Sequence, residues 1–260
     1  MKYKTIELRF EKSVANLTLN RPEALNALNL EMGRELIDAF GRITDEGARC
    51  VLLTGQGRAF CAGGDVKAMA SSDRVDEFFA DALEMIHGAI ATLAAYPRVV
   101  IAAINGFASG AGMNLALACD LRIAGESARF NEAFVRIGAV PDCGGTYHLP
   151  RIVGWSRAAE LMLLGDMVDA HEAERLGIVT RVVADEELIG VATEFARRIA
   201  TGPMAAYERI KQLLRASATS TLNEQLEREA QMQREIGQTE DFLEGVTAFL
   251  EKRPPHYSGR

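Results

Sequence analysis

Hydrophobic residues recur with two different periods along the first fifty positions of the chain. In "TIELRF" (5–10) and "VANLTLN" (14–20) they alternate with polar residues, which predicts a hairpin of two half-buried strands. Residues 29–46 have the longer period of an amphipathic helix. Its hydrophobic face carries Leu30, Leu36, Ile37, Phe40 and Ile43. The chain is therefore expected to begin with a hairpin followed by a helix.

Four later segments are short and almost continuously hydrophobic, as buried strands are: "RCVLLTG", "RVVIAAING", "DLRIAG" and "VTRVVAD". Helical stretches lie between them, and this alternation predicts an α/β fold with a substantial parallel sheet. From about residue 185 the pattern is wholly helical, with an interruption at Thr201-Gly202-Pro203. We predict a core over residues 1–200 and a C-terminal helical region over residues 201–260.

Composition and charge restrict the class of protein. A chain of 260 residues with 48% hydrophobic and 25% charged residues is typical of a soluble globular protein. The net charge of −7 argues against a nucleic-acid or anionic membrane surface, because those partners need a basic face. The four cysteines lack C-x-x-C spacing, which indicates reduced thiols. No signal-peptide core or bilayer-length hydrophobic run is present, so we expect a cytoplasmic protein.

Two glycine clusters follow predicted buried strands: "GQGRAFCAGGD" (55–65) and "NGFASGAGMNLALACD" (105–120). Glycines at such turns let a ligand approach the backbone, whose N–H groups can hold a developing negative charge. A tight packing turn is the alternative interpretation of each cluster. Neither has the Gly-Lys-Ser/Thr of a P-loop or the G-x-G-x-x-G of a dinucleotide site, so both of those functions are excluded here.

Five segments together resemble the enoyl-CoA hydratase/isomerase (crotonase) superfamily in order and spacing. They are "LNRPEALNAL", "AFCAGGDVKAM", "NGFASGAGMNLALACD", "IGAVPDCGGTYHLPRIVG" and "AFLEKRPPHY". The resemblance covers essentially the whole chain. It implies a spiral of β-β-α repeats, a C-terminal helical trimerisation region and assembly into a homotrimer or a hexamer made of two trimers. It also implies an acyl-CoA thioester as ligand, so that coenzyme A belongs to the substrate and no separate cofactor is expected.

The resemblance assigns site residues as well. It implies an oxyanion hole made of the backbone N–H groups of Gly64 and Ala111, which would stabilise negative charge on the thioester oxygen. Losing one such donor typically costs roughly 3 kcal/mol of transition-state stabilisation. Contacts with the CoA moiety or the acyl group are implied for Ala62, Asp65, Val66 and Lys67, although a solvated lysine is the alternative for Lys67. Residues 70–95 would form the variable wall of the acyl pocket.

The chain departs from the hydratase pattern at both acidic positions. Hydratases of this family use two glutamates to activate water, and their positions match Asn114 and Phe134 here. Asparagine cannot accept a proton, and phenylalanine can neither donate nor accept one. Asp142 matches a position where isomerases of the family carry their acid. The patterns "PDxGGT" and "GAGxNLAL" are most similar to the phenylacetate-pathway isomerases that rearrange a ring epoxide.

A single acid suits a proton shuttle better than it suits the addition of water, because hydration must both deprotonate water and protonate carbon. We therefore predict an acyl-CoA isomerase in which Asp142 is the catalytic base. The alternatives are a hydratase with a rearranged acid such as Glu132, a dehalogenase-like enzyme, and a non-catalytic acyl-CoA-binding or RNA-binding relative. Asp142 could also serve only to shape the turn after Pro141.

Other chemically interesting residues are interpreted as structural. Cys143 adjoins Asp142, but the sequence places no histidine to activate it, so we expect a small filler in a glycine turn. The histidines show no metal-binding spacing, and no metal site is predicted. Trp155 is expected in the core.

Overall fold

The computed structural model of the chain describes residues 3–71 and 73–259, apart from the side chains at positions 75 and 77–79. Its larger sheet has six strands: β1 (Ile6–Glu11), β2 (Val14–Leu19), β3 (Cys50–Gly55), β5 (Val99–Ile104), β7 (Leu121–Gly125) and β10 (Arg181–Val183). They lie in the order β1-β2-β3-β5-β7-β10. Only β1 and β2 pair antiparallel, as a hairpin, and the other neighbours are parallel. The predicted hairpin and parallel sheet are confirmed.

A smaller sheet, which the sequence pattern did not predict, has four short strands. They are β4 (Ala59–Cys61), β6 (Phe107–Ser109), β8 (Arg129–Asn131) and β9 (Val168–Asp169). Neighbours in this list pair with one another, parallel for β4, β6 and β8 and antiparallel for β9. Segments of two or three residues are too short for alternation of polar and hydrophobic residues to be recognised.

Successive turns of the chain add one strand to each sheet and then a helix. After β3 and β4 come α2 (Val66–Ala70) and α3 (Val75–Ala95), and after β5 and β6 comes α4 (Ala111–Leu117). After β7 and β8 come the 3₁₀ helix η2 (Ala133–Ile137) and α5 (Gly145–Val153). This repetition is the β-β-α spiral that the resemblance implied, and the prediction of the fold class is confirmed.

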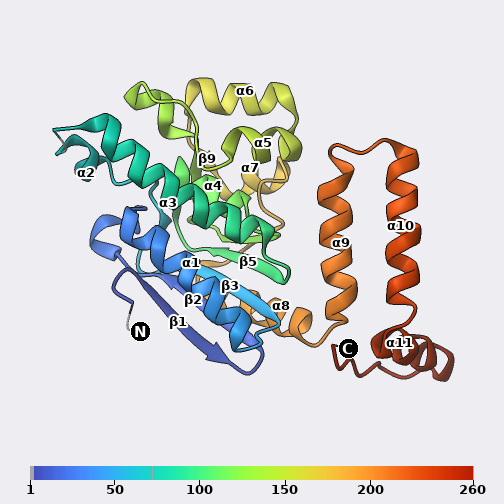
Figure 1. Cartoon of the computed structure of the whole chain (residues 1–260). Coiled ribbons are helices and arrows are strands. Elements are labelled where there is room, and N and C mark those ends of the chain that lie inside the picture. The colour runs from blue at the N-terminus through green and yellow to red at the C-terminus, as the bar shows by residue number, and fades with distance from the viewer. Residues whose placement is uncertain (1–2, 72, 260) are drawn as a thin grey trace.

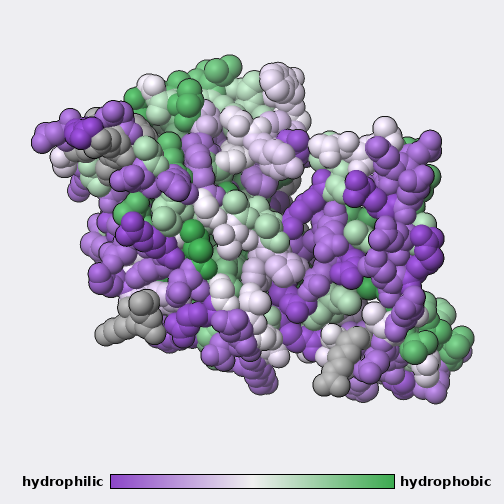
Figure 2. Space-filling view, in the orientation of Figure 1, coloured by the Kyte–Doolittle hydropathy of each residue, from purple (hydrophilic) through white to green (hydrophobic). Residues whose placement is uncertain are grey.

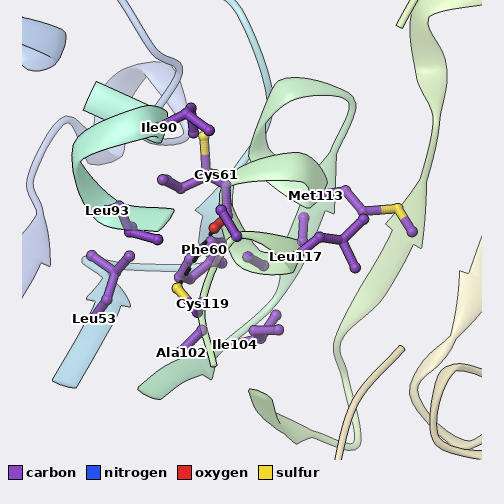
Figure 3. Close-up of a cluster of buried hydrophobic side chains, with 14 of the residues drawn as sticks. Leu53, Phe60, Cys61, Ile90, Leu93, Ala102, Ile104, Met113, Leu117 and Cys119 are labelled. Carbon is purple, nitrogen blue, oxygen red and sulfur yellow. Dashed lines mark hydrogen bonds between the residues drawn. The ribbon is translucent and has the colours of Figure 1, made fainter. Parts of the chain in front are cut away.

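Helices and the smaller sheet cover both faces of the larger sheet, which is why its central strands β3 and β5 are hydrophobic on both sides. One face packs against α1 (Leu30–Asp45), α3 and the smaller sheet, and the other against α8 (Leu188–Ala200). Figure 3 shows the first of these layers, where side chains of β3, β4 and β5 meet those of α3 and α4. The predicted helix over 29–46 is confirmed as α1, and the Asn29 side chain caps it by accepting a hydrogen bond from Met32 N at 2.9 Å.

The remaining elements lie at the edges of the core and after it. They are η1 (Pro22–Ala24), α6 (Trp155–Leu164), α7 (Ala170–Arg175), η3 (Asp185–Glu187), α9 (Met204–Ser217), α10 (Leu222–Ile236) and α11 (Glu240–Glu251). Figure 1 shows α9, α10 and α11 to one side of the sheets. Trp155 is 82% exposed at the start of α6, so the prediction that it lies in the core is wrong. None of the helices in the described residues combines the length and hydrophobicity of a membrane span.

One buried cation fastens α9 to the core. Lys211 Nζ donates hydrogen bonds to Tyr96 O at 2.9 Å and Arg98 O at 2.6 Å, and it lies 2.5 Å from Asp120 Oδ2. Burial lowers the pKa of Lys211, and the negative charge of Asp120 opposes that shift. A buried ammonium with three acceptors is satisfied in full, so α9 is held in one position against the ends of the sheet.

The packing of α4 on β4 yields a test of the fold. A Cβ atom at Gly112 would lie 2.1 Å from the carbonyl oxygen of Cys61, so any side chain there must push α4 away from the sheet. We expect Gly112→Ala to lower the free energy of unfolding by about 1–3 kcal/mol. The matched control is Gly41→Ala on the exposed face of α1, where no atom lies within 4 Å of the added Cβ. That change should stabilise the protein by roughly 0.5–1 kcal/mol, because it only restricts the unfolded chain. Urea unfolding measures both, and a Gly112→Ala protein as stable as the parent would contradict the packing described.

Candidate active site

Three parallel strands of the smaller sheet end beside one another, and the chain that follows each of them reaches the same cavity. Cys61 of β4 pairs with Ala108 of β6, and Ser109 of β6 pairs with Asn131 of β8. Because the carboxyl ends of parallel strands meet at one edge of a sheet, the turns after β4, β6 and β8 are brought together. They surround a cavity of about 640 Å³. The two glycine clusters recognised in the sequence are two of these turns.

The walls of this cavity are mainly hydrophobic. Side chains from the start of α1, from α2, from α3 and from η2 and the loop after it contribute Leu28, Met69, Ala82, Leu83, Ile86, Phe134, Ile137 and Val140. The contribution of α3 falls within the range 70–95, which the resemblance assigned to the acyl pocket. A cavity of this size and character suits a hydrophobic group of moderate length rather than a highly charged one.

At this edge the backbone N–H groups of Gly64 and Ala111 line the cavity and donate to no backbone acceptor among the described residues. Ala111 is the first residue of α4, where the N–H has no partner within the helix. The turns approach closely, since a Cβ atom at Gly63 would lie 2.9 Å from Ser109 O and 3.7 Å from Ala111 N. The φ angles of Gly63 (+105°) and Gly110 (+50°) are also ones that side chains disfavour. Glycine is therefore required for the two N–H groups to line one cavity.

The residues predicted to contact CoA occupy different environments. Ala62, Asp65 and Val66 line the cavity, whereas Lys67 is exposed on α2 and outside the lining. The Asp65 carboxylate accepts hydrogen bonds from Arg21 Nη2 at 2.8 Å and from the backbone N of Ala68, in α2, at 3.1 Å. Burial is the largest single influence and would raise the pKa of Asp65, but the hydrogen bonds from Arg21 and Ala68 N and the nearby positive charges together outweigh it, so the pKa is lowered. Asp65 thus holds its turn in place, and a CoA contact for Lys67 stays a prediction.

Asp142 lines the same cavity, in the loop before α5, where its carboxyl group lies beside the Cys143 thiol. Its Oδ1 atom is buried without a hydrogen-bond partner among the described residues. The turn is held through its main chain instead, because Asp142 O accepts from Asn114 Nδ2 at 2.9 Å and from Gly145 N at 3.0 Å. Cys143 and Gly144 complete it with left-handed φ angles of +50° and +78°. The turn is thus held by main-chain hydrogen bonds, and the buried Oδ1 atom of Asp142 takes no part in holding it.

The two positions that match hydratase glutamates hold no acid, and they lie differently. Phe134 lines the cavity, with its ring 3.4 Å from where a Cβ atom of Gly110 would be. Asn114 is fully buried behind the wall. The cavity surface is therefore hydrophobic where a hydratase of this family would present its second carboxylate.

Glu132 is the acid whose environment the sequence did not reveal. Glu132, a candidate acid in the hydratase alternative, is 0% exposed and does not line the cavity. Neither carboxyl oxygen has a hydrogen-bond partner among the described residues. Burial raises the pKa of Glu132 to about 8; the Asn114 side chain lowers it and the charge of Asp142 raises it further. A charged residue directly after the buried strand residues Phe130 and Asn131 was the available signal.

His87 is a second residue that sequence reasoning missed. It lies on α3, and its Nε2 atom accepts a hydrogen bond from Cys143 N at 3.3 Å. Ligand atoms of His87, Asp142 and Cys143 all lie within 4.8 Å of one another. Burial, together with the charge of Asp142, raises the pKa of the Cys143 thiol and keeps it protonated, which suits neither a nucleophile nor a metal ligand. The absence of a metal site stays a prediction. Fifty-six positions separate His87 from Cys143, so no local pattern could have paired them.

The sequence profile of the enoyl-CoA hydratase/isomerase family matches residues 9–260. The chain belongs to this family. It is 44% identical to a "probable enoyl-CoA hydratase" of Rhodobacter capsulatus, over the full length of both chains. It is 42% identical to the 1,2-epoxyphenylacetyl-CoA isomerase of Escherichia coli, with 96% of this chain and 97% of the relative covered. Relatives of similar identity thus carry the names of two different activities.

Solved structures of the enoyl-CoA hydratase/isomerase family have the same fold as this chain. An enoyl-CoA hydratase from Bacillus anthracis superimposes with a TM-score of 0.94 at 37% identity, covering 99% of this chain and 100% of the other. A structure described as an enoyl-CoA hydratase subunit from Geobacillus kaustophilus gives 0.93 at 36% identity, with both chains covered in full. The family assignment therefore rests on sequence and fold together.

Removing one of the two free N–H groups tests whether they act on the ligand. Proline is tolerated at the first position of a helix, so Ala111→Pro deletes the donor while α4 persists. We expect turnover of an acyl-CoA substrate to fall by roughly 10²- to 10³-fold, with CoA binding largely kept. Leu222→Pro, at the exposed first position of α10, is the matched control and should retain full turnover. Unchanged turnover in folded Ala111→Pro protein would show that the oxygen is bound elsewhere.

Proposed function

We propose that this protein is an acyl-CoA isomerase in which Asp142 moves a proton between two carbon atoms of an unsaturated or ring-bearing acyl group. The observation that carries the proposal is the state of the two acids lining the cavity. Asp65 is paired with Arg21, whereas Asp142 has a buried, unpartnered carboxyl oxygen. Asp142 is thus the lining acid whose carboxylate is free to accept a proton from a ligand in the cavity.

The proposed chemistry follows from the thioester. Removing a proton from the carbon beside it drives negative charge onto its oxygen, and the N–H groups of Gly64 and Ala111 would stabilise that enolate. Asp142 would take the proton and return it to another carbon, so atoms and charge balance without a separate cofactor. Phe134 supports this reaction because it keeps water away from the base. Excluding water also strengthens the hydrogen bonds to the enolate oxygen.

The acyl group is proposed from the cavity and from one relative. The hydrophobic walls suit an alkenyl, aromatic or cyclic acyl group. The 42% identical relative from Escherichia coli, which is named 1,2-epoxyphenylacetyl-CoA isomerase, supports including ring-bearing substrates. An isomerisation that rearranges a ring and one that moves a double bond both use a base beside an oxyanion hole, so both belong in the test.

Hydration is the second candidate function, and one observation favours it. Glu132 supplies a second carboxyl group close enough to Asp142 for the charge of Asp142 to act on its pKa. Most of the similar relatives are also named hydratases. Glu132 lies outside the cavity lining, however, so it would have to act on water through an opening that the described residues do not show.

We further propose that the chain assembles as a homotrimer, with two trimers forming a hexamer. The outer face of α11 supports this, because five of its large hydrophobic side chains are exposed: Phe242, Leu243, Val246, Phe249 and Leu250. Figure 2 shows hydrophobic side chains gathering on the surface over α11. A hollow of about 360 Å³ between α9 and α11 is lined by Val246, Phe249 and Leu250 among other, mainly hydrophobic, residues. Surfaces of this kind usually contact another protein.

Light scattering tests the assembly. At micromolar concentration we expect the mass of three or six chains, because burying the α11 face would remove its hydrophobic side chains from water. The double change Phe249→Glu and Leu250→Glu should shift the mass toward one chain. Ile189→Glu, at an exposed position of α8, is the control and should leave the mass unchanged. A stable monomer of the unaltered chain at that concentration would remove the proposal.

Asp142→Asn tests the base directly. Asparagine keeps the size of the side chain and removes its basicity, so isomerisation should fall by roughly 10²- to 10⁴-fold while stability changes little. The control is Asp45→Asn at the exposed end of α1, which should behave as the parent. The substrates are a panel of 2-enoyl, 3-enoyl and ring-epoxide acyl-CoAs, and mass spectrometry separates a product of unchanged mass from one that has gained water. Gain of water as the main outcome would make hydration the leading function, and a fully active Asp142→Asn protein would place the base elsewhere.

A further inference from the structure

The protonation state of Glu132 is set by its surroundings. The side chain is fully buried, and no described group donates a hydrogen bond to either oxygen. An ionised carboxylate in such a place is far more costly than a neutral one. Burial accordingly raises its pKa to about 8, so the group holds its proton at neutral pH. A neutral carboxylic acid, unlike a carboxylate, has one O–H to donate.

The Asn114 side chain lies within hydrogen-bonding reach of Glu132, and its oxygen can accept that O–H. The Asn114 amide is oriented by Asp142, because Asn114 Nδ2 donates to Asp142 O at 2.9 Å and only the nitrogen end can do so. Asn114 Oδ1 must then point elsewhere, and it is buried without a partner among the described residues. The amide is tightly held, since a Cβ atom at Gly145 would lie 2.4 Å from Nδ2 and 2.6 Å from Oδ1. Two neighbouring buried acceptors, on Asn114 and Glu132, are both satisfied by one proton.

We propose that Glu132 works as a neutral acid that donates a hydrogen bond to Asn114 Oδ1, so that the Asn114 amide holds the main chain of Asp142 in position for proton transfer. The proposal rests on the role proposed above for Asp142. Glu132 is a positioning residue, because it does not line the cavity and acts on the base only through Asn114.

This chain of hydrogen bonds would fix the distance between the two working parts of the site. Asn114 lies on the first turn of α4, the helix that begins with the free N–H of Ala111. One short helix thus carries an oxyanion donor and the amide that holds the base. A small displacement of either part can lower the rate by about 10²-fold. An Asn114 amide that has lost its hydrogen bond to Glu132 should therefore lower kcat more than it weakens substrate binding.

The titratable groups that face Glu132 are Asp142 and Cys143, both in the loop before α5, while α4 contributes the polar Asn114. An ionised Asp142 repels a second negative charge and favours the neutral form of Glu132. The pKa of Glu132 is higher in the folded protein than in the unfolded chain, so its protonation contributes to the free energy of unfolding. This contribution is complete at pH values below the ordinary pKa of glutamic acid. That contribution is lost as the pH rises to about 8.

Two substitutions separate the hydrogen bond from the charge. Glu132→Gln keeps a donor for Asn114 Oδ1 and cannot ionise, so kcat should stay within about threefold of the parent and lose its decline above pH 8. Glu132→Met fills similar space without a donor, and kcat should fall by roughly 10²-fold with KM little changed. A Glu132→Met protein whose kcat equals that of the parent would overturn the proposal. So would a Gln variant as inactive as Asp142→Asn, because Glu132 would then transfer the proton itself.

A measurement without turnover keeps the test independent of the proposed reaction. At pH 7 the infrared difference spectrum between parent and Glu132→Gln should contain the carbonyl band of a protonated carboxyl, and the band should disappear above pH 8. Thermal unfolding should show the Gln variant gaining stability relative to the parent between pH 5 and pH 9. Absence of the band, or a stability difference that does not change with pH, would overturn the neutral state even if Glu132→Met fails to fold. If the parent protein shows the band but no isomerase activity, the result would instead contradict the role proposed for Asp142.

Discussion

The close approach of α4 to β4 is the constraint on which the rest of the site depends. At Gly112 the helix backbone lies so near Cys61 that no side chain fits between them. This contact sets where α4 begins, and hence where the N–H of Ala111 and the amide of Asn114 lie. The Gly63 turn then fits against Ser109 and Ala111 for the same reason. Backbone atoms packed against backbone atoms give a rigid site, since neither partner can change rotamer.

Around that frame, the protein distributes its acids by what each can be paired with. Asp65 is balanced by Arg21 and becomes part of a turn. Glu132 is sealed from water, where only the neutral form is inexpensive. Asp142 alone among these three lines the cavity without a partner for its buried oxygen. Three carboxyl groups are thus in three different states, and burial together with the nearest donor decides each one.

Sequence reasoning recovered what local patterns encode. The hairpin of β1 and β2, the helix α1 and the long strands of the larger sheet follow from periodicity over five or more residues. The glycine clusters indicated two turns that line the cavity, and the family resemblance assigned Gly64, Ala111 and Asp142 to the site. The strands of the smaller sheet were missed because β4, β6 and β8 have three residues each. The burial of Glu132 and the contact between His87 and Cys143 depend on segments far apart in the chain, which no local pattern records. The position of Trp155 was predicted wrongly because the identity of a large aromatic residue does not show whether it lies in the core or on the surface.

The buried hydrogen bonds of Lys211 show how the C-terminal region is joined to the core. The predicted boundary between the core and the C-terminal region lies at residue 201, where the helical pattern is interrupted. This boundary assigns α9 to the C-terminal region. A chain shortened to that point would leave the Asp120 carboxylate without its cation and the carbonyls of Tyr96 and Arg98 without their donor. Asp120 also accepts a hydrogen bond from Val100 N, within the larger sheet. The first helix of the C-terminal region is therefore needed in any fragment that keeps this ion pair of the core.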